Sequence, residues 1–288
     1  MGEAKGGTRV KYIFLNLKRF DISPARGGVN RLYPMDRWGA GIVRATQEAL
    51  CGYAGARFVM FFPEAHLLGA RAALEAPGPV ELGCQGVCAG DTAPGGNFGA
   101  FTGGRTANAA RELGCGWALI GHCEERVRKL ELLSLAGVTG VDAAQAVNRA
   151  LGQEVRAAQA AGLSVLYCVG ERLEERASWR EVLSDQLTQG LDGADLSRVV
   201  VGYEPVWSIG PGRTPADAHC IRETARWLKS RMGGVPVVYG GGLKLENAGM
   251  LAGIEEIDGG LIALTRFSGE IGFYPDEFLQ IVEAYLGH

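Results

Sequence analysis

Three consecutive segments read RVVVGYEP (198–205), TPADAHCIRETARWLKSRMGG (214–234) and VPVVYGG (235–241). The two outer segments are short and apolar nearly throughout, rather than alternating between apolar and polar residues. Continuous apolar strands of this kind are typical of a parallel sheet that is covered by helices. The middle segment is predicted as a helix, with Thr214 as its N-cap, Pro215 in its first turn, and Lys, Arg and paired Gly at its end. The unit is therefore strand, helix, parallel strand.

The same unit recurs along the chain. Further short apolar runs, several of them ending in Gly, occupy residues 12–17, 57–62, 80–85, 117–121, 164–170 and 259–265. Helical periodicity fills residues 142–163, where Gly162 ends the pattern, and returns in residues 275–288. Eight strand–helix units in about 250 residues are what an eight-stranded β/α barrel requires. The predicted fold class is therefore α/β, a single (β/α)8 barrel.

The domain organisation follows from the same pattern. Residues 1–9 are expected to form a flexible tail, and residues 10–288 one barrel domain without an internal linker. A doubly wound open sheet could use the same local pattern, but the count of eight strands favours closure. Longer connections, some of them expected to be functional loops at the carboxyl ends of strands, are predicted at residues 20–38, 86–98 and 127–142.

Composition narrows the possible partners. The chain has 288 residues, 47% of them hydrophobic, which is enough to bury a large core. It carries 29 basic and 32 acidic residues without a block of like charge, so neither nucleic acid nor an anionic membrane is an expected partner. No apolar run approaches the roughly 20 residues of a spanning helix, and the first residues lack the apolar core of a secretory signal. A cytoplasmic location is expected.

The seven cysteines do not predict a metal centre. They are scattered, and the one close pair, CQGVC (84–88), has no second pair behind it. Buried free thiols in a reducing compartment are the simpler interpretation. We therefore expect no metal ligands and no cofactor.

Polar side chains stand at the ends of three predicted strands. Asn16 and Lys18 close the first strand, His122 and Glu124 follow the fourth, and Glu204 ends the sixth. In a β/α barrel the carboxyl ends of the strands carry the chemistry, so these side chains are expected to converge. Each has an ordinary alternative, because a single Glu or Lys is usually solvated and a single His usually structural. Their joint placement at strand ends favours function.

Five segments, NLK (16–18), GHCEER (121–126), CVGERLEER (168–176), YEPVWSIGPGR (203–213) and YGGGLKLENA (239–248), resemble the signature segments of the triosephosphate isomerase family. They occur in that family's order and at compatible spacing, and the resemblance extends from about residue 12 to residue 282. It implies an aldose–ketose isomerase of a small phosphosugar that needs no cofactor.

The resemblance also implies roles for the residues at the strand ends. Glu204 would be the base that moves a proton between two carbons, and a carboxylate needs a desolvated site to do so. His122, kept neutral by a helix N-terminus, would donate a hydrogen bond to the substrate oxygens. Lys18 would stabilise the enediolate and pair with the phosphate, and Asn16 would add a donor. Glu124 would orient Lys18 or a neighbouring loop.

The segment after Glu204 resembles a lid. Pro205, Val206 and Trp207 would form a stiff hinge, while Gly210 and Gly212 give flexibility at the other end. Closure would bring a backbone N–H of the segment to the phosphate and exclude water from the site. A rigid surface turn is the alternative reading of these residues.

The phosphate end departs from the family pattern. Gly242 stands where a Ser is usual, and Ala263 and Leu264 replace a Gly–Gly pair whose amides meet the phosphate. Thr265 and Arg266 follow and could supply replacement contacts, since Arg binds phosphate well. Near the predicted catalytic residues, Cys123 replaces a Ser and Glu125 replaces an Arg.

Three functions are compatible with this pattern. The first is a divergent isomerase that interconverts dihydroxyacetone phosphate and glyceraldehyde 3-phosphate. The second is an isomerase of a four-carbon ketose phosphate, and the third is a barrel that binds or scaffolds without catalysis. Retention of Asn16, Lys18, His122 and Glu204 argues against the third. The segment GAFTGG (99–104) resembles the family's loop that inserts into a partner subunit, so a homodimer is expected.

Overall fold

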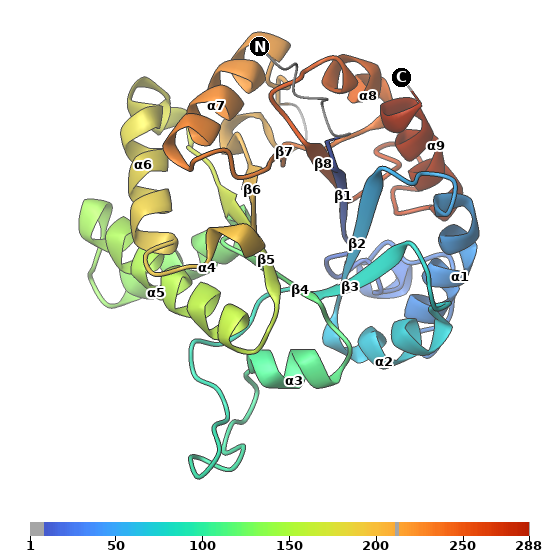
Figure 1. The fold of residues 1–288 in the computed structure, drawn as a ribbon, viewed down its shortest axis with the longest axis horizontal. Coiled ribbons are helices and arrows are strands. Elements are labelled where there is room, and N and C mark those ends of the chain that lie inside the picture. Colours follow the sequence, from blue (N-terminus) through green and yellow to red (C-terminus); the bar gives the residue numbers. More distant parts are fainter. Residues whose placement is uncertain (1–8, 211–212, 288) are drawn as a thin grey trace, which may run out of the picture.

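Eight parallel strands close into a barrel in sequence order, and β1 pairs with both β2 and β8 (Figure 1). The computed structural model describes residues 9–210 and 213–287. Most of the predicted tail, together with Pro211 and Gly212 of the predicted lid, lies outside the described residues. The helices form a ring around the barrel in Figure 1. The predicted (β/α)8 fold is confirmed.

A strand overlaps every predicted apolar run. The strands are β1 Lys11–Asn16, β2 Ala56–Phe62, β3 Val80–Cys84, β4 Trp117–Ile120, β5 Ser164–Val169, β6 Val199–Tyr203, β7 Val237–Tyr239 and β8 Gly259–Ile262. The helices are α1 Trp38–Leu50, α2 Glu64–Ala73, α3 Ala107–Glu112, α4 Cys123–Leu135, α5 Gly140–Ala160, α6 Trp179–Gly190, α7 Ala218–Arg231, α8 Leu245–Ala252 and α9 Pro275–Leu286. Short 3-10 turns are η1 Pro24–Arg26, η2 Leu173–Ser178, η3 Leu196–Arg198 and η4 Val206–Ser208.

The strands have two buried faces, which explains why their sequences do not alternate in polarity. One set of side chains, including Phe14 and Val200, fills the inside of the barrel. The intervening residues, including Leu15 and Val201, pack against the surrounding helices. Successive side chains of a strand point to opposite sides, so every second residue after Phe14 faces inward. That alternation brings the residues at the strand ends to the mouth of the barrel.

Helix α7 begins later than the sequence suggests. The prediction of Thr214 as N-cap and Pro215 in the first turn is wrong, because the helix starts at Ala218. Its N-cap is Asp217, whose carboxylate accepts the backbone N–H of Cys220 at 2.8 Å. A carboxylate caps the first turn and also interacts favourably with the positive end of the helix dipole, which a threonine hydroxyl does not.

Helix α4 occupies much of the predicted connection 127–142. That part of the prediction is wrong, because the helix continues to Leu135. None of its residues is fully buried, and Leu130 and Leu133 pack only partly against the core, so its apolar stripe is narrow. Gly137, two residues after the last helical residue, has a φ of 79° in the left-handed region favoured by glycine.

The segment between β3 and α3 extends away from the barrel at the lower edge of Figure 1. It contains the predicted connection 86–98 and the segment GAFTGG (99–104). Phe98, near its middle, is 92% exposed. None of the described helices is both long and apolar enough to cross a membrane.

Candidate active site

A cavity of about 750 Å³ opens at the carboxyl ends of the strands. Asn16 is the last residue of β1, Gln85 follows β3, and His122 follows β4. All three line the cavity together with Lys18 and Glu124. Four of the five predicted catalytic residues therefore share one cavity, and the fifth, Glu204, lies directly behind His122.

The side chain of Asn16 is held in one orientation by its neighbours. Its Oδ1 accepts the backbone N–H of Lys18 at 3.1 Å and the Nε2 group of Gln85 at 3.2 Å. Gln85 also donates to the carbonyl oxygens of Lys18 and Phe61. Because Oδ1 already accepts hydrogen bonds, the NH2 group is the part of Asn16 that can serve a ligand. Gln85 was not predicted from the sequence.

Lys18 is held in a strained conformation. Its φ of 40° lies in the left-handed region, which costs about 1 kcal/mol or more for a residue with a side chain. Its Nζ donates to Oε1 of Glu124 at 2.7 Å. Burial alone would raise the pKa of Glu124, but the hydrogen bond and charge of Lys18 outweigh it and lower that pKa. Glu124 therefore fixes the position of the ammonium group.

His122 is the N-cap residue of α4. Its Nδ1 accepts the backbone N–H of Glu124 at 3.2 Å. A ring nitrogen that accepts a hydrogen bond carries no proton, so the proton of the neutral imidazole lies on Nε2. This contact, at the positive end of a helix, gives the tautomer that can donate from Nε2.

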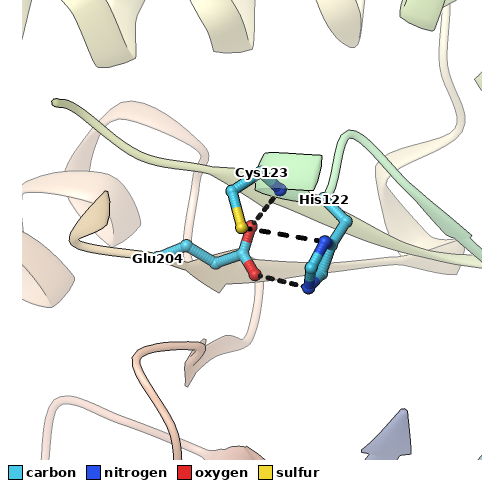
Figure 2. A group of neighbouring side chains, drawn as sticks. All are labelled: His122, Cys123 and Glu204. Atoms are coloured by element: carbon cyan, nitrogen blue, oxygen red, sulfur yellow. Dashed lines mark hydrogen bonds and ion pairs between the residues drawn. The ribbon is translucent and has the colours of Figure 1, made fainter. Parts of the chain in front are cut away.

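Glu204 is bound at rest by the first residues of α4, as Figure 2 shows. Its Oε2 accepts the backbone N–H of Cys123 at 2.9 Å, and its Oε1 lies 3.2 Å from Nε2 of His122. The side chain is 2% exposed. Burial raises the pKa of Glu204, while the neighbouring His122 and the Cys123 N–H act against the increase. A desolvated carboxylate of raised pKa is a stronger base than one in water.

Two glycines make room for Glu204. A Cβ atom placed on Gly240, just after β7, would lie 2.6 Å from Cγ of Glu204. A Cβ atom on Gly170, just after β5, would lie 1.8 Å from the backbone oxygen of Glu204. Neighbouring strands can therefore approach this carboxylate only because they lack side chains at these positions.

The predicted lid is anchored by a buried carboxylate that the sequence did not single out. Oε1 of Glu171 accepts the indole N–H of Trp207 at 2.7 Å and the hydroxyl of Tyr203 at 3.1 Å. The guanidinium of Arg176 stacks on Trp207 at 3.9 Å from the ring centroid. Trp207 lies in η4, at the predicted hinge. Gly210 is exposed, with a φ of 112°. The Glu171–Trp207 contact couples β5 to the hinge.

The residues predicted at the phosphate end form a separate cluster. Thr265 and Arg266 pair with Gly272 in a short hairpin, and both side chains bind Glu277 in the first turn of α9. Ala263 and Leu264 are half-buried at the end of β8. These four residues, like Gly242 and Gly210, are not among those that line the 750 Å³ cavity.

This arrangement suits proton transfer next to a carbonyl group. A desolvated carboxylate, a neutral imidazole that donates from Nε2, an ammonium group and an amide donor lie within one region. The carboxylate can remove a proton, and the three donors can stabilise the negative charge that then develops on oxygen.

Comparison with known proteins agrees with this chemistry. The family model described as triosephosphate isomerase matches residues 40–285. A triosephosphate isomerase of Alcanivorax borkumensis is 35% identical over 250 residues, which cover 82% of this chain and 90% of the relative. One of Halorhodospira halophila is 35% identical over 256 residues, covering 84% and 92%.

A solved structure is similar over almost the whole chain. The crystal structure of triosephosphate isomerase from Bartonella henselae matches with a TM-score of 0.68 and 26% identity, covering 96% of this chain and 98% of that chain. Together, the matched residues, the sequence relatives and the closed barrel place this chain in the triosephosphate isomerase family.

Proposed function

We propose that this protein is an enzyme that interconverts dihydroxyacetone phosphate and glyceraldehyde 3-phosphate. The observation that carries the proposal is the meeting of Glu204 with the Nε2 side of His122, beside the Lys18–Glu124 pair. The residues that we propose as base, electrophile and cation lie close together, and the chain belongs to the triosephosphate isomerase family.

The reaction begins with an exchange of hydrogen bonds. At rest, Nε2 of His122 lies 3.2 Å from Oε1 of Glu204, so neither group is free for a substrate. Binding places the substrate oxygens on Nε2 of His122, Nζ of Lys18 and the amide of Asn16. Glu204 is then released from the imidazole and can turn its carboxylate toward the substrate carbons.

Proton transfer then proceeds in two steps. Glu204 takes the proton from the carbon next to the carbonyl, and an enediolate forms. His122 and Lys18 stabilise the negative oxygen, which is where preorganised donors lower the barrier most. Nε2 of His122 gives its proton to the negative oxygen and takes the proton of the neighbouring hydroxyl, and Glu204 returns its proton to the neighbouring carbon, which exchanges ketose for aldose. Closure of the predicted lid over the site would keep water away from the enediolate.

A four-carbon ketose phosphate is the alternative substrate, because the residues expected near the phosphate differ from the family pattern. Thr265 and Arg266 are bound to Glu277 at rest, and a phosphate would have to draw them away. A further cationic side chain, that of Lys244, lies near Gly242. Nζ of Lys244 lies 4.0 Å from the ring centroid of Phe267, and its Cε would lie 3.4 Å from a Cβ on Gly242. We propose that these groups hold the phosphate.

The decisive experiment compares substrates. The ratio of kcat/KM on glyceraldehyde 3-phosphate to kcat/KM on erythrulose phosphates is expected to exceed one. A ratio far below one would establish the four-carbon function instead. Absence of activity on both would leave the non-catalytic function.

We further propose that the protein acts in the cytoplasm as a homodimer. The extended segment between β3 and α3 carries an aromatic residue, Phe98, that is almost fully exposed in the single chain. A partner subunit that covers this segment would remove that apolar surface from water. Residues 99–104, whose sequence resembles the inserting loop of family dimers, belong to the same segment.

A further inference from the structure

The turn that carries His122 from β4 to α4 contains a glycine in a conformation and a space that suit no other residue. Gly121 has a φ of 81°, in the left-handed region. A Cβ atom on it would lie 2.7 Å from the backbone oxygen of Cys168 in β5. Because glycine has no side chain to anchor the turn, the position of His122 depends on the contacts of the peptide groups of Gly121.

Two side chains from the first turn of α4 hold those peptide groups. Oε2 of Glu125 accepts the backbone N–H of Gly121 at 2.7 Å, and Nε of Arg126 donates to the carbonyl oxygen of the same glycine at 2.8 Å. The backbone N–H groups of Glu125 and Arg126 in turn donate to the carbonyl oxygen of His122, at 2.9 and 3.0 Å. In a capping box, too, the carboxylate of the third helical residue holds the chain that enters the helix. The residues around His122 are therefore fixed by reciprocal hydrogen bonds.

Glu125 is the unusual member of this arrangement. Arg126 belongs to the family-like segment GHCEER (121–126), whereas Glu125 stands where an Arg is usual. An arginine side chain has N–H donors and no acceptor, so it cannot bind the N–H of Gly121. The contact between Glu125 and Gly121 is thus a feature of this chain that the family pattern does not supply.

The carboxylate of Glu125 is itself held in place. Nζ of Lys129, one helical turn further along α4, lies 3.2 Å from Oε1 of Glu125 and 2.7 Å from Oε1 of Glu154 in α5. Both carboxylates are mostly buried. Lys129 therefore binds one oxygen of Glu125 and leaves the other to Gly121. A hydrogen bond from a backbone N–H to an ionised carboxylate is stronger than one to a neutral acceptor.

We propose that Glu125 is a positioning residue for His122 and acts by accepting the N–H of Gly121. By fixing the turn, it keeps Nδ1 of His122 on the backbone N–H of Glu124 and directs Nε2 toward the substrate oxygens. Its own oxygens are bound by Gly121 and Lys129, so it acts through His122 and not on the substrate. The effect on catalysis rests on the proposed function, whereas the effect on the geometry of His122 does not.

Two variants separate the acceptor from the side chain. Glu125→Met keeps the length of the side chain and removes the acceptor, and it is expected to lose about 10- to 100-fold in kcat on glyceraldehyde 3-phosphate while KM stays within about threefold. Glu125→Gln retains an acceptor oxygen, so its kcat should stay within about threefold of the unmodified protein. Glu131→Met, the same exchange at an exposed position of α4, is the control and should keep its activity. Kinetics are compared at a temperature at which thermal unfolding shows every variant to be folded.

Nitrogen NMR of the histidines reports the geometry of His122 without any substrate. The chain has four histidines, and His122→Gln identifies the signals of His122 by their absence. The Nδ1 signal is expected to shift in Glu125→Met, because the contact with the N–H of Glu124 loosens. It should stay in place in Glu125→Gln and in Glu131→Met.

The outcomes distinguish this proposal from the proposed function. An unchanged His122 signal in Glu125→Met would overturn the proposal, whatever the kcat of that variant. In an active enzyme, an unchanged kcat, a loss confined to KM, or equal losses in Glu125→Met and Glu125→Gln would overturn it as well. A shifted signal in a protein without any isomerase activity would support the positioning of His122 and count against the proposed function.

Discussion

Glu204 is a buried carboxylate whose two oxygens each have a polar partner. Its two carboxylate oxygens are bound at rest by an imidazole and by a backbone N–H, both from the start of α4. These bonds reduce the cost of burying the charge. They also involve the Nε2 group that we propose as a donor to the substrate, so we expect substrate binding and release of the proposed base to be coupled.

Glu204→Gln retains the shape of the side chain and removes its basicity. The variant is expected to lose at least about 100-fold in kcat, with a smaller change in KM, because a positioned general base contributes that much. Steady-state kinetics on glyceraldehyde 3-phosphate give both constants. Glu131→Gln, at an exposed position of α4, is the matched control. Turnover near that of the control in Glu204→Gln would rule out the proposed base.

Gly240→Ala tests the space around the base. The new methyl group would meet Cγ of Glu204 at 2.6 Å, so the carboxylate must shift. A displacement of this size should lower kcat/KM by about 10- to 100-fold. Gly253→Ala, where the nearest atom to a new Cβ is 3.6 Å away, should retain its activity. Equal activities in the two variants would show that the position of Glu204 is not critical.

Among the elements, α4 and α5 share a charged cluster behind the active site. Lys129 of α4 bridges Glu154 of α5 at 2.7 Å and Glu125 at 3.2 Å, and Glu125 accepts the N–H of Gly121 at 2.7 Å. Burial, followed by the charge of Glu125, raises the pKa of Glu154 to about 8. The cluster links the residue before His122 to the packing of two helices.

This cluster predicts a pH dependence of stability. Between its ordinary pKa of 4.5 and about 8, Glu154 binds a proton in the folded state but not in the unfolded state. The free energy of unfolding should therefore fall as pH rises through this window, by at most about 1.4 kcal/mol per pH unit. Glu154→Gln should remove this contribution, whereas Glu131→Gln should retain it. Urea unfolding from pH 5 to pH 9 measures the free energy of unfolding of both variants. If that free energy changes with pH equally in the two variants, Glu154 is not the group responsible.

At the scale of the whole molecule, the barrel joins residues that are far apart in sequence. Cys123 and Glu204 are separated by 81 positions, and Lys18 and Glu124 by 106. The closed set of parallel strands supplies the fixed spacing between them. The same architecture leaves the segment between β3 and α3 outside the barrel, where it can serve assembly.

Phe98→Ser tests that assembly. If a second subunit covers this segment, loss of the aromatic ring should raise the dimer dissociation constant at least about tenfold, since buried aromatic residues dominate interfaces. Sedimentation velocity over a dilution series provides the measurement. Leu68→Ser, which changes another exposed apolar residue in α2, should not alter the dissociation constant. The same constant in both variants would place the interface elsewhere.

Local sequence patterns determined the eight strands, the helices overlapping residues 142–163, 214–234 and 275–288, and the family. They also predicted the polar residues at strand ends that lie in or beside the cavity. The apolar run of a strand and the polar residues that follow it are adjacent in the sequence, so both can be recognised from the sequence alone. Only the tertiary structure decided three sets of contacts. They are the resting contacts of Glu204, the hydrogen bond from Gln85 to Asn16, and the hydrogen bond from Trp207 to Glu171. Each joins strands or loops whose relative positions depend on barrel closure and register. The length of α4 also escaped prediction, because its apolar stripe is narrow and none of its residues is fully buried.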